Sequence, residues 1–271
     1  LVAPFAFLGG GYPGTGGTCG VSIAAGASCT LVVRYSPLAV AAHSGSLELQ
    51  YNNGAVVTSV VRPVQGQAGA PALLTVSNGA TYNYGTRATG SSTPFTFTVT
   101  NSGAVTATGV ADAGVLAAPF TYVGGTYPGT AGTCGASVAA GASCTVVVAF
   151  EPTGLGVANS SIDLDYNDGA VAQVTTRAVT GTGANPALLT ISDAATYNYG
   201  SITVGATADH TFTVDNTGGV AATSIAESTL AAPYTFLGGS FPGTGGTCTT
   251  SLSAGASCTL VVRYAPTASG V

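Results

Sequence analysis

The residues best suited to chemistry in this sequence are six cysteines, which fall into three pairs with the same spacing. The pairs are Cys19 and Cys29, Cys134 and Cys144, and Cys248 and Cys258. Paired cysteines can form a disulfide, bind a metal ion or remain as free thiols. A metal site is disfavoured, because the sequence has no Cys-x-x-Cys motif and no histidine close to any pair.

A disulfide within each pair is the favoured interpretation, and buried free thiols are the remaining alternative. A bridge requires Cα atoms about 5.5 Å apart, and the small residues Gly141, Ala142 and Ser143 before Cys144 allow such a tight return. Each bridge would close a glycine-rich loop and stabilise the fold by roughly 2–3 kcal/mol. Because disulfides persist in oxidising surroundings, the pairs predict a secreted or cell-surface protein.

Alternating acidic residues in "DLDYNDG" (163–169) form a candidate calcium site. Asp163, Asp165 and Asn167 have the alternating oxygen ligands of calcium loops. The glycine comes one place late for such a loop, and the related segment "ELQYNNG" (48–54) lacks both aspartates. The alternative is a strand with an outward polar face, ending in an Asn-Asp-Gly hairpin turn. This alternative is favoured, and no cofactor is expected.

Catalytic groups are sparse in this sequence. The two histidines, His43 and His210, and the acidic residue Glu151 do not recur at equivalent positions of the sequence repeat described below. We therefore interpret them as isolated surface residues, and no nucleophile is placed beside either histidine for a Ser-His-Asp arrangement. "GTGGTCG" lacks the lysine of a phosphate-binding loop. The sequence predicts a protein that is not an enzyme.

An aromatic residue precedes Pro-Gly near each cysteine pair, at Tyr12, Tyr127 and Phe241. This side chain either anchors its loop to the protein or forms an exposed contact for a glycan or protein ligand. The anchor is the favoured interpretation. Arg62 and Arg177 also occupy equivalent positions, where they could pair with a carboxylate.

The composition excludes several classes of partner. Only 6% of the 271 residues are charged, there is no lysine, and the net charge is -5. Nucleic acid is therefore not expected, because no basic stripe is available to neutralise phosphates, and a polybasic membrane contact is excluded likewise. The hydrophobic content of 46% allows sizeable cores. No apolar run reaches the roughly 20 residues of a membrane-spanning helix.

An internal repeat organises the chain. "LVAPFAFLGGGYPGTGGTCG" at residue 1 returns as "LAAPFTYVGGTYPGTAGTCG" at 116 and "LAAPYTFLGGSFPGTGGTCT" at 230. Gly-rich joints at 66–71 and 181–186 indicate the boundaries. We predict a complete repeat at 71–185, the C-terminal part of another at 1–70, and the N-terminal part of a further one at 186–271. The chain is expected to belong to a longer array.

The periodicity within the repeat is that of β-strands. "TPFTFTVTN" (93–101) places Phe95, Phe97 and Val99 on one face, and "NSSIDLDYNDG" (159–169) alternates in the same way. "CTVVVAF" (144–150) is typical of a strand buried on both faces. With turn signals between them, about seven short strands in each repeat of about 115 residues predict an immunoglobulin-like β-sandwich. The predicted fold class is all-β, with tandem sandwich repeats.

The order of motifs "YNYG", "FTVTNSG", "CTVVVAFEPTGLG", "LDYNDG" and "VTGTG" resembles the ASH-type immunoglobulin-like domains of bacterial choice-of-anchor D surface proteins. The resemblance covers the complete repeat and recurs in both partial ones. It implies a β-sandwich in a secreted or cell-surface setting. It implies no activity, since this fold hosts many roles.

These observations together predict an extracellular structural protein that forms a stalk or fibre. Exposed sheet edges are usually guarded by charge, most often by lysine, which this chain lacks. One hypothesis is therefore that copies associate with one another into a filament. The alternative is a monomeric string of domains whose sheet edges are protected by short strands or bulges. The alternative function is an adhesin-type module that binds a glycan or surface protein through the Tyr-Pro-Gly loops.

Overall fold

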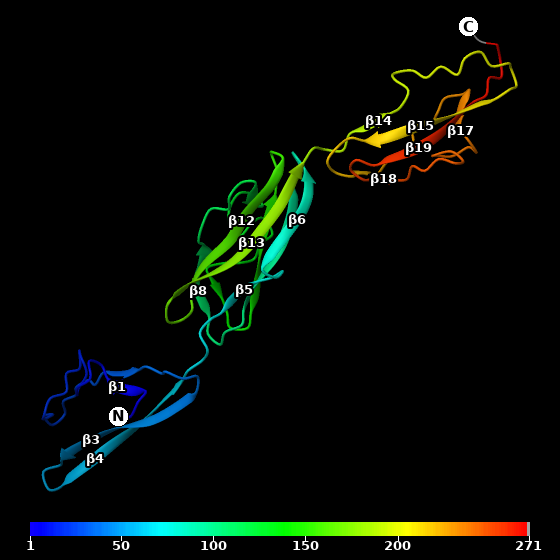
Figure 1. The fold of residues 1–271 in the computed structure, drawn as a ribbon. Coiled ribbons are helices and arrows are strands. Elements are labelled where there is room, and N and C mark those ends of the chain that lie inside the picture. The colour runs from blue at the N-terminus through cyan, green and yellow to red at the C-terminus, as the bar shows by residue number, and fades with distance from the viewer. Residues whose placement is uncertain (270–271) are drawn as a thin grey trace.

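The structure, a computed structural model, describes residues 1–269. Its regular elements are all β-strands, and no helix occurs among the described residues. The prediction of an all-β fold is confirmed for this part of the chain. The described residues therefore include no helix that is long and apolar enough to span a bilayer. Figure 1 shows three segments in a row: an N-terminal segment (1–70), a central segment (71–185) and a C-terminal segment (186–269).

The central segment contains nine strands in two sheets. The strands are β5 (Leu74–Val76), β6 (Thr81–Ala88), β7 (Thr93–Asn101), β8 (Ala107–Asp112), β9 (Phe120–Tyr122), β10 (Ser137–Val138), β11 (Ser143–Phe150), β12 (Gly156–Asn167) and β13 (Ala172–Ala184). One sheet has the order β10-β8-β12-β13-β6 and the other β5-β7-β11-β9. The predicted number of about seven was too low, because strands as short as β9 and β10 leave no alternating pattern in the sequence.

Both sheets contribute to one apolar core. Phe97 and Val99 of β7 and Val148 and Phe150 of β11 are fully buried, and they pack with Ile162, Leu164 and Tyr166 of β12. The predicted alternation in β7 and β12 is confirmed, and so is the burial of β11, where five consecutive residues are buried. The two sheets and their shared core form a β-sandwich.

The N-terminal segment has four strands. They are β1 (Phe5–Phe7), β2 (Val33–Tyr35), β3 (Ala42–Asn52) and β4 (Val57–Gln67). β1 pairs with β2, and β3 forms a long hairpin with β4. By sequence they correspond to β9, β11, β12 and β13. The N-terminal segment therefore contains a hairpin that matches β12–β13, with one short sheet beside it.

The C-terminal segment has six strands. They are β14 (Leu189–Ile191), β15 (Ala208–Asn216), β16 (Ala222–Thr223), β17 (Tyr234–Phe236), β18 (Ser251–Leu252) and β19 (Ser257–Tyr264). The sheet β14-β15-β19-β17 matches β5-β7-β11-β9, and β16-β18 matches β8-β10. No hairpin equivalent to β12–β13 follows β19 within the described residues. One face of its main sheet therefore lacks the cover that the central segment has.

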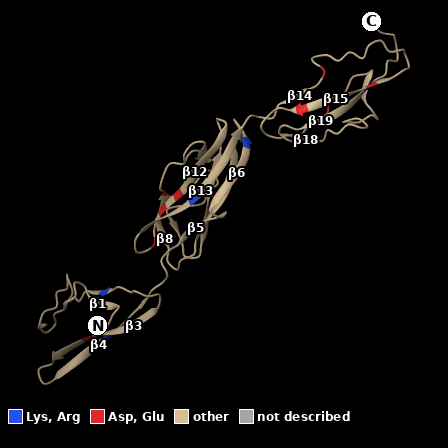
Figure 2. Ribbon diagram, viewed as in Figure 1, with Lys and Arg blue, Asp and Glu red and all other residues tan. Residues whose placement is uncertain are grey.

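The few charged residues are scattered over all three segments (Figure 2). They form no basic stripe, as the composition predicts. The division of the chain into one complete and two partial repeats remains a prediction.

Candidate functional site

The six cysteines form three disulfides, Cys19–Cys29, Cys134–Cys144 and Cys248–Cys258. The Cα atoms of each pair lie 4.8 Å apart. The predicted pairing is confirmed, and the alternative of free thiols is wrong. Three disulfides are consistent with a secreted or extracellular protein.

Each disulfide lies beside a matching pair of threonines. In the central segment the backbone N–H groups of Thr133 and Cys134 donate to the carbonyl oxygen of Thr145, at 2.9 and 3.1 Å. The Thr145 N–H donates back to the Thr133 hydroxyl at 3.0 Å. The same contacts join Thr18 to Thr30 and Thr247 to Thr259. The disulfide and the threonine pair together hold the loop along β11.

The Tyr-Pro-Gly turn is bonded to the same strand. The Val147 N–H donates to the carbonyl oxygen of Pro128 at 2.8 Å. Gly129 has φ +90°, and a Cβ there would lie 2.3 Å from the carbonyl oxygen of Val147. Only glycine tolerates both conditions. The turn is therefore part of the edge of the sheet.

The aromatic residue of each turn packs against a neighbouring ring. Tyr12 meets Phe7, Tyr127 meets Tyr122, and Phe241 meets Phe236, each edge-on with centroids 5.6 to 5.7 Å apart. Tyr127 and Phe241 are half-buried, whereas Tyr12 is 47% exposed. These contacts are those of a loop anchor, and only Tyr12 leaves much of its ring in solvent.

A buried asparagine at the end of β7 organises the surrounding turns. Asn101 is fully buried, and its Oδ1 accepts from the N–H groups of Leu73 and Gly103 at 3.1 and 3.0 Å. Its Nδ2 donates to the carbonyl oxygens of Val105 and Val138 at 2.9 and 3.0 Å. The amide thereby joins the segment before β5, the loop between β7 and β8, and strand β10.

The same network recurs around Asn216 in the C-terminal segment. In the sequence, this asparagine stands out only as part of the motif "FTVTNSG". Its return 115 positions later was the available signal of a structural role.

The joints between segments are short and hydrogen-bonded on both sides. At the first joint, the Ala68 N–H donates to the carbonyl of Ala41 in the N-terminal segment at 2.9 Å. Two residues on, the Ala70 carbonyl accepts from Ala104 in the central segment at 3.0 Å. One residue thus separates the attachments to the two segments.

The second joint is tighter still. The Ala184 carbonyl accepts from Thr89 of the central segment at 2.8 Å, and the adjacent Asn185 carbonyl accepts from Gly219 of the C-terminal segment at 3.0 Å. A Cβ on Gly219 would lie 2.9 Å from the Cβ of Ala184, so the two segments are in close contact.

The candidate calcium ligands do not form a binding loop. Asp163, Asp165 and Asn167 follow one another on an extended strand, β12, and so do not surround a common point. Asp163 accepts from the Ser161 hydroxyl at 2.6 Å, and Asn167 accepts from the Gly169 N–H at 2.8 Å. Residues 1–269 contain no cluster of three or more His, Cys, Asp or Glu suited to a metal. The favoured alternative, a strand ending in a hairpin turn, is confirmed.

Asp168 is the carboxylate with the structural role in this turn. It is buried, and its carboxylate accepts from the N–H groups of Ala170 and Val171, both at 2.8 Å, and from Gln173 at 3.0 Å. These hydrogen bonds hold the pKa of Asp168 below its ordinary value. Asn53 caps the equivalent turn of β3–β4 with the same pair of backbone bonds.

The interpretation of the two histidines as isolated residues is wrong. His43 Nδ1 lies 2.9 Å from the hydroxyl of Tyr35. His210 stacks on Tyr197 with centroids 3.7 Å apart, and its Nε2 lies 2.9 Å from Asp193. Non-local packing brings these partners together, so sequence spacing does not reveal them.

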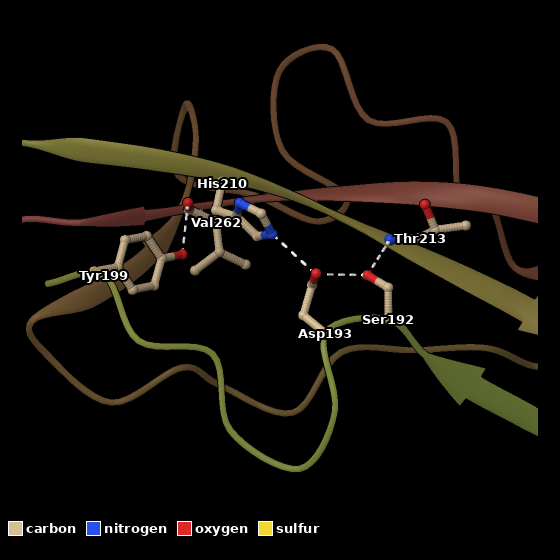
Figure 3. A network of polar contacts seen from close by, with 6 residues as sticks. All are labelled: Ser192, Asp193, Tyr199, His210, Thr213 and Val262. Atoms are coloured by element: carbon tan, nitrogen blue, oxygen red, sulfur yellow. Dashed lines mark hydrogen bonds and ion pairs between the residues drawn. The ribbon is translucent and has the colours of Figure 1, made fainter.

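Figure 3 shows the polar network around His210. Ser192 donates to Asp193 at 2.7 Å and accepts from the Thr213 N–H at 3.0 Å. The aspartate thus lies between the serine and the histidine, whereas general-base activation of a serine requires the histidine beside it. The bonds from His210 and Ser192 lower the pKa of Asp193. The remaining candidate, Glu151, is exposed and accepts from Ser92 at 2.7 Å.

Arg177, which could have paired with a carboxylate, is instead hydrogen-bonded to the backbone. Arg177 donates to the carbonyl oxygen of Val76. Arg62 on β4 is exposed. Arg263, by contrast, forms a bidentate pair with Asp209, at 2.7 and 2.8 Å, which lowers the pKa of the aspartate.

No protein-family model matches the chain. No curated protein matches it either. Among solved structures, it is similar to the VesB protease of Vibrio cholerae, with 21% identity and a TM-score of 0.33 over 40% of this chain and 31% of that one. The chain thus spans less than a third of that protease.

Two further solved structures have comparable scores. A Porphyromonas gingivalis W83 protein of unknown function has 13% identity and a TM-score of 0.33, over 71% of this chain and 83% of that one. The ASH/PapD-like domain 7 of human CEP192 has 12% identity and a TM-score of 0.31, over 42% and 86% respectively.

Proposed function

We propose that this chain is part of an extracellular array of tandem immunoglobulin-like repeats of about 115 residues, which serves as a stalk or fibre on a bacterial surface. The observation that carries the proposal is the joint. At both junctions, residues at most two positions apart are hydrogen-bonded to opposite segments. A linker fixed in this way transmits orientation from one segment to the next, which is the property that a spacer needs.

The kind of contact that recurs from one segment to the next supports the same function. The features that recur at intervals of 114 or 115 residues are structural: the disulfide, the threonine pair, the Tyr/Phe-Pro-Gly turn and the buried asparagine. The contact between Asp193 and His210 does not recur, because Asn78 and Phe95 occupy these positions in the central segment. Its neighbouring bonds do recur there, between Ser77 and Thr98 and between Tyr84 and Val148, and they are structural. Disulfides also suit a spacer in an oxidising exterior, because they do not depend on a large core.

Small-angle X-ray scattering on the chain tests the proposal. A rod of three segments, with β13 alone about 40 Å long, requires a radius of gyration well above the about 18 Å of a compact 271-residue protein. A value that stays well above 18 Å on dilution supports a stiff array. A value near 18 Å, or the scattering profile of a flexible chain, refutes it.

A second function, an adhesin that uses the Tyr-Pro-Gly loop, is favoured by one observation. The ring of Tyr12 is 47% exposed and lies over Phe7, so it offers an aromatic surface to a sugar or peptide. Binding to a glycan array that is lost in Tyr12→Ala, but kept in Tyr51→Ala as a control, would support this role.

A further inference from the structure

Two asparagines of the sequence are followed directly by glycine, Asn53 and Asn78. Asparagine is chemically labile, because the backbone nitrogen of the next residue can attack the side-chain carbonyl carbon and displace ammonia. Glycine hinders this attack least, since it has no Cβ. The two Asn-Gly pairs are therefore the places where the chain is best able to modify itself, and their surroundings differ.

The Asn53-Gly54 pair is held by hydrogen bonds of its own hairpin turn. The N–H of Gly54 donates to Oδ1 of Asn52 at 2.8 Å, so the attacking nitrogen is already bonded. Oδ1 of Asn53 accepts from the N–H groups of Ala55 and Val56, both at 2.9 Å. These three hydrogen bonds must break before the nitrogen and the side chain can react.

The Asn78-Gly79 pair, in the turn between β5 and β6, has none of these restraints. Both residues are exposed, and their φ angles are +75° and +72°. Within residues 1–269, no hydrogen bond involves the side-chain amide of Asn78 or the N–H of Gly79. A Cβ on Gly79 would meet no atom within 4 Å. Both reacting groups are therefore open to water and unrestrained.

The C-terminal segment shows that a carboxylate fits at this position. Asp193 is the equivalent of Asn78, and it accepts from the hydroxyl of Ser192 at 2.7 Å (Figure 3). The serine before this position accepts the same backbone N–H bond in both segments, from β15 in one and from β7 in the other. Ser77 is therefore placed to donate to a carboxylate at position 78, as Ser192 does to Asp193.

A positive charge lies next to the turn in the central segment. Arg177 of β13 donates to the carbonyl oxygen of Val76, two positions before Asn78. Within residues 1–269 its guanidinium has no carboxylate partner, and its Nε is buried without a hydrogen bond. A negative charge at position 78 would partly compensate this guanidinium. The charge is therefore not expected to destabilise the segment.

We propose that Asn78 is a site of spontaneous deamidation, at which the chain exchanges a neutral amide for a carboxylate. The nitrogen of Gly79 bonds to Cγ of Asn78, the bond from Cγ to Nδ2 breaks, and ammonia leaves. The glycine nitrogen gives its proton to solvent, and the departing nitrogen takes one up. Water then opens the resulting cyclic imide at either of its carbonyl groups, which produces aspartate or isoaspartate. This inference goes beyond the proposed structural function and does not depend on it.

The two products differ in their effect on the fold. Aspartate adds one negative charge to the central segment and leaves the main chain unchanged. Isoaspartate places an additional carbon atom in the main chain between β5 and β6, which belong to different sheets. Only the aspartate product therefore reproduces what the C-terminal segment already has in its sequence.

Peptide mass mapping of the full chain, incubated in heavy-oxygen water at neutral and mildly alkaline pH, tests the proposal. A newly formed carboxyl group takes up solvent oxygen and is thereby distinguished from one that was present at the start. We expect label at Asn78 to accumulate at least about tenfold faster than at Asn53, because three hydrogen bonds protect the second site. The rate should rise with pH, since the attacking nitrogen must lose its proton.

Gly79→Ala is the matched variant. Ala194 holds the equivalent position in the C-terminal segment with φ +61°, so the turn accepts alanine. The added methyl group should slow the labelling of Asn78 several-fold and leave that of Asn53 unchanged. Asn78→Asp, which has the side chain of the aspartate product, should fold and melt like the wild type.

Equal labelling at Asn78 and Asn53, or no label at Asn78, overturns the proposal. An unchanged labelling rate in Gly79→Ala overturns it as well, because the reaction would then not pass through the nitrogen of residue 79. A melting temperature of Asn78→Asp well below that of the wild type would show that the fold does not accept the product. None of these outcomes bears on the extended shape of the chain, so the proposed stalk is tested separately.

Discussion

At the scale of single residues, the side chains that matter most here are polar and buried. Asn101 uses both ends of its amide, and the groups that it satisfies come from loops up to 38 positions away. The sequence contains the asparagine and its repetition at Asn216, but the partners depend on the packing of the two sheets. Local patterns therefore could not predict the role of this residue.

Replacing Asn101 by Ala should destabilise the central segment by about 3 kcal/mol or more. The substitution removes the side-chain partner of two N–H groups and two carbonyls in buried or part-buried surroundings. Each such group costs about 1–3 kcal/mol where water cannot replace the lost partner. Urea unfolding followed by tyrosine fluorescence measures the effect. Asn167→Ala, which removes one exposed turn bond, is the control and should cost below about 1 kcal/mol. Equal losses in the two variants would contradict the assigned role.

The acid response of the hairpin turn should depend on Asp168. Hydrogen bonds to the ionised carboxylate lower its folded-state pKa below the unfolded value of about 3.9. The stabilisation is therefore fully present above about pH 4 and is lost as the pH falls through the lower folded-state pKa. Asp193 and Asp209, whose pKa values are also lowered, act in the same direction.

In the variant Asp168→Asn, the urea midpoint should fall less steeply as the pH is lowered than it does in the wild type. The variant should still form the hairpin turn at neutral pH. Asn53 shows that an amide oxygen accepts the same two backbone bonds in the equivalent turn of β3–β4. Urea midpoints measured from pH 7 down to pH 2 test this. If the urea midpoint depends on pH equally in the variant and the wild type, other carboxylates are responsible for the loss of stability in acid.

At the scale of elements, the internal repeat shows how far local sequence determines a strand. The pentapeptide "TYNYG" lies in β6 at residues 81–85, but the identical residues 196–200 form no strand. β6 pairs in parallel with β13, and the C-terminal segment has no such neighbour among the described residues. A strand needs a partner for its backbone groups, so the same five residues form a strand in one segment and not in the other.

The close packing of glycine and aromatic residues between the sheets gives the third prediction. A Cβ on Gly181 would lie 2.7 Å from Phe150, which is fully buried and has no room to move. Gly181→Ala should therefore destabilise the central segment by about 1–3 kcal/mol through overpacking. Gly135→Ala, where a Cβ meets nothing within 4 Å, is the matched control and should be nearly neutral. Thermal unfolding compares them, and equal melting temperatures would refute the steric argument.

The stapled loop gives the fourth prediction. Replacing Cys134 and Cys144 together by Ala should cost roughly 2–3 kcal/mol, since the bridge removes the freedom of the unfolded loop. The turn at Pro128 and the threonine pair should keep the loop near β11 in the folded state. Denaturant unfolding with and without a reductant tests both points. The reductant breaks all three disulfides of the wild type but only the two remaining ones of the double variant. If the bridge is the cause, reduction should therefore lower the stability of the wild type by more than that of the double variant.

At the scale of the whole molecule, the division into one complete and two partial repeats rests on sequence repetition and remains a prediction. The disulfide pairing followed from spacing, because a bridge of ten positions is a local event. The joints were visible only as glycine-rich stretches, which are also typical of flexible linkers. Their hydrogen bonds to both neighbouring segments depend on tertiary contacts that composition does not encode.

Stiffness at the second joint is the last prediction. Ala184 and Asn185 are adjacent, and their carbonyls are bonded to opposite segments. A four-residue Gly-Ser insertion between them should uncouple the segments, because such linkers behave as random coils. The radius of gyration from X-ray scattering should then fall, and the profile should become that of a flexible chain. The same insertion after Gly114, in an exposed loop of the central segment, lengthens the chain equally and should leave the rod unchanged. Identical scattering from the two insertions would mean that the joint is already flexible and that the hydrogen bonds on either side of it do not set the shape of the array.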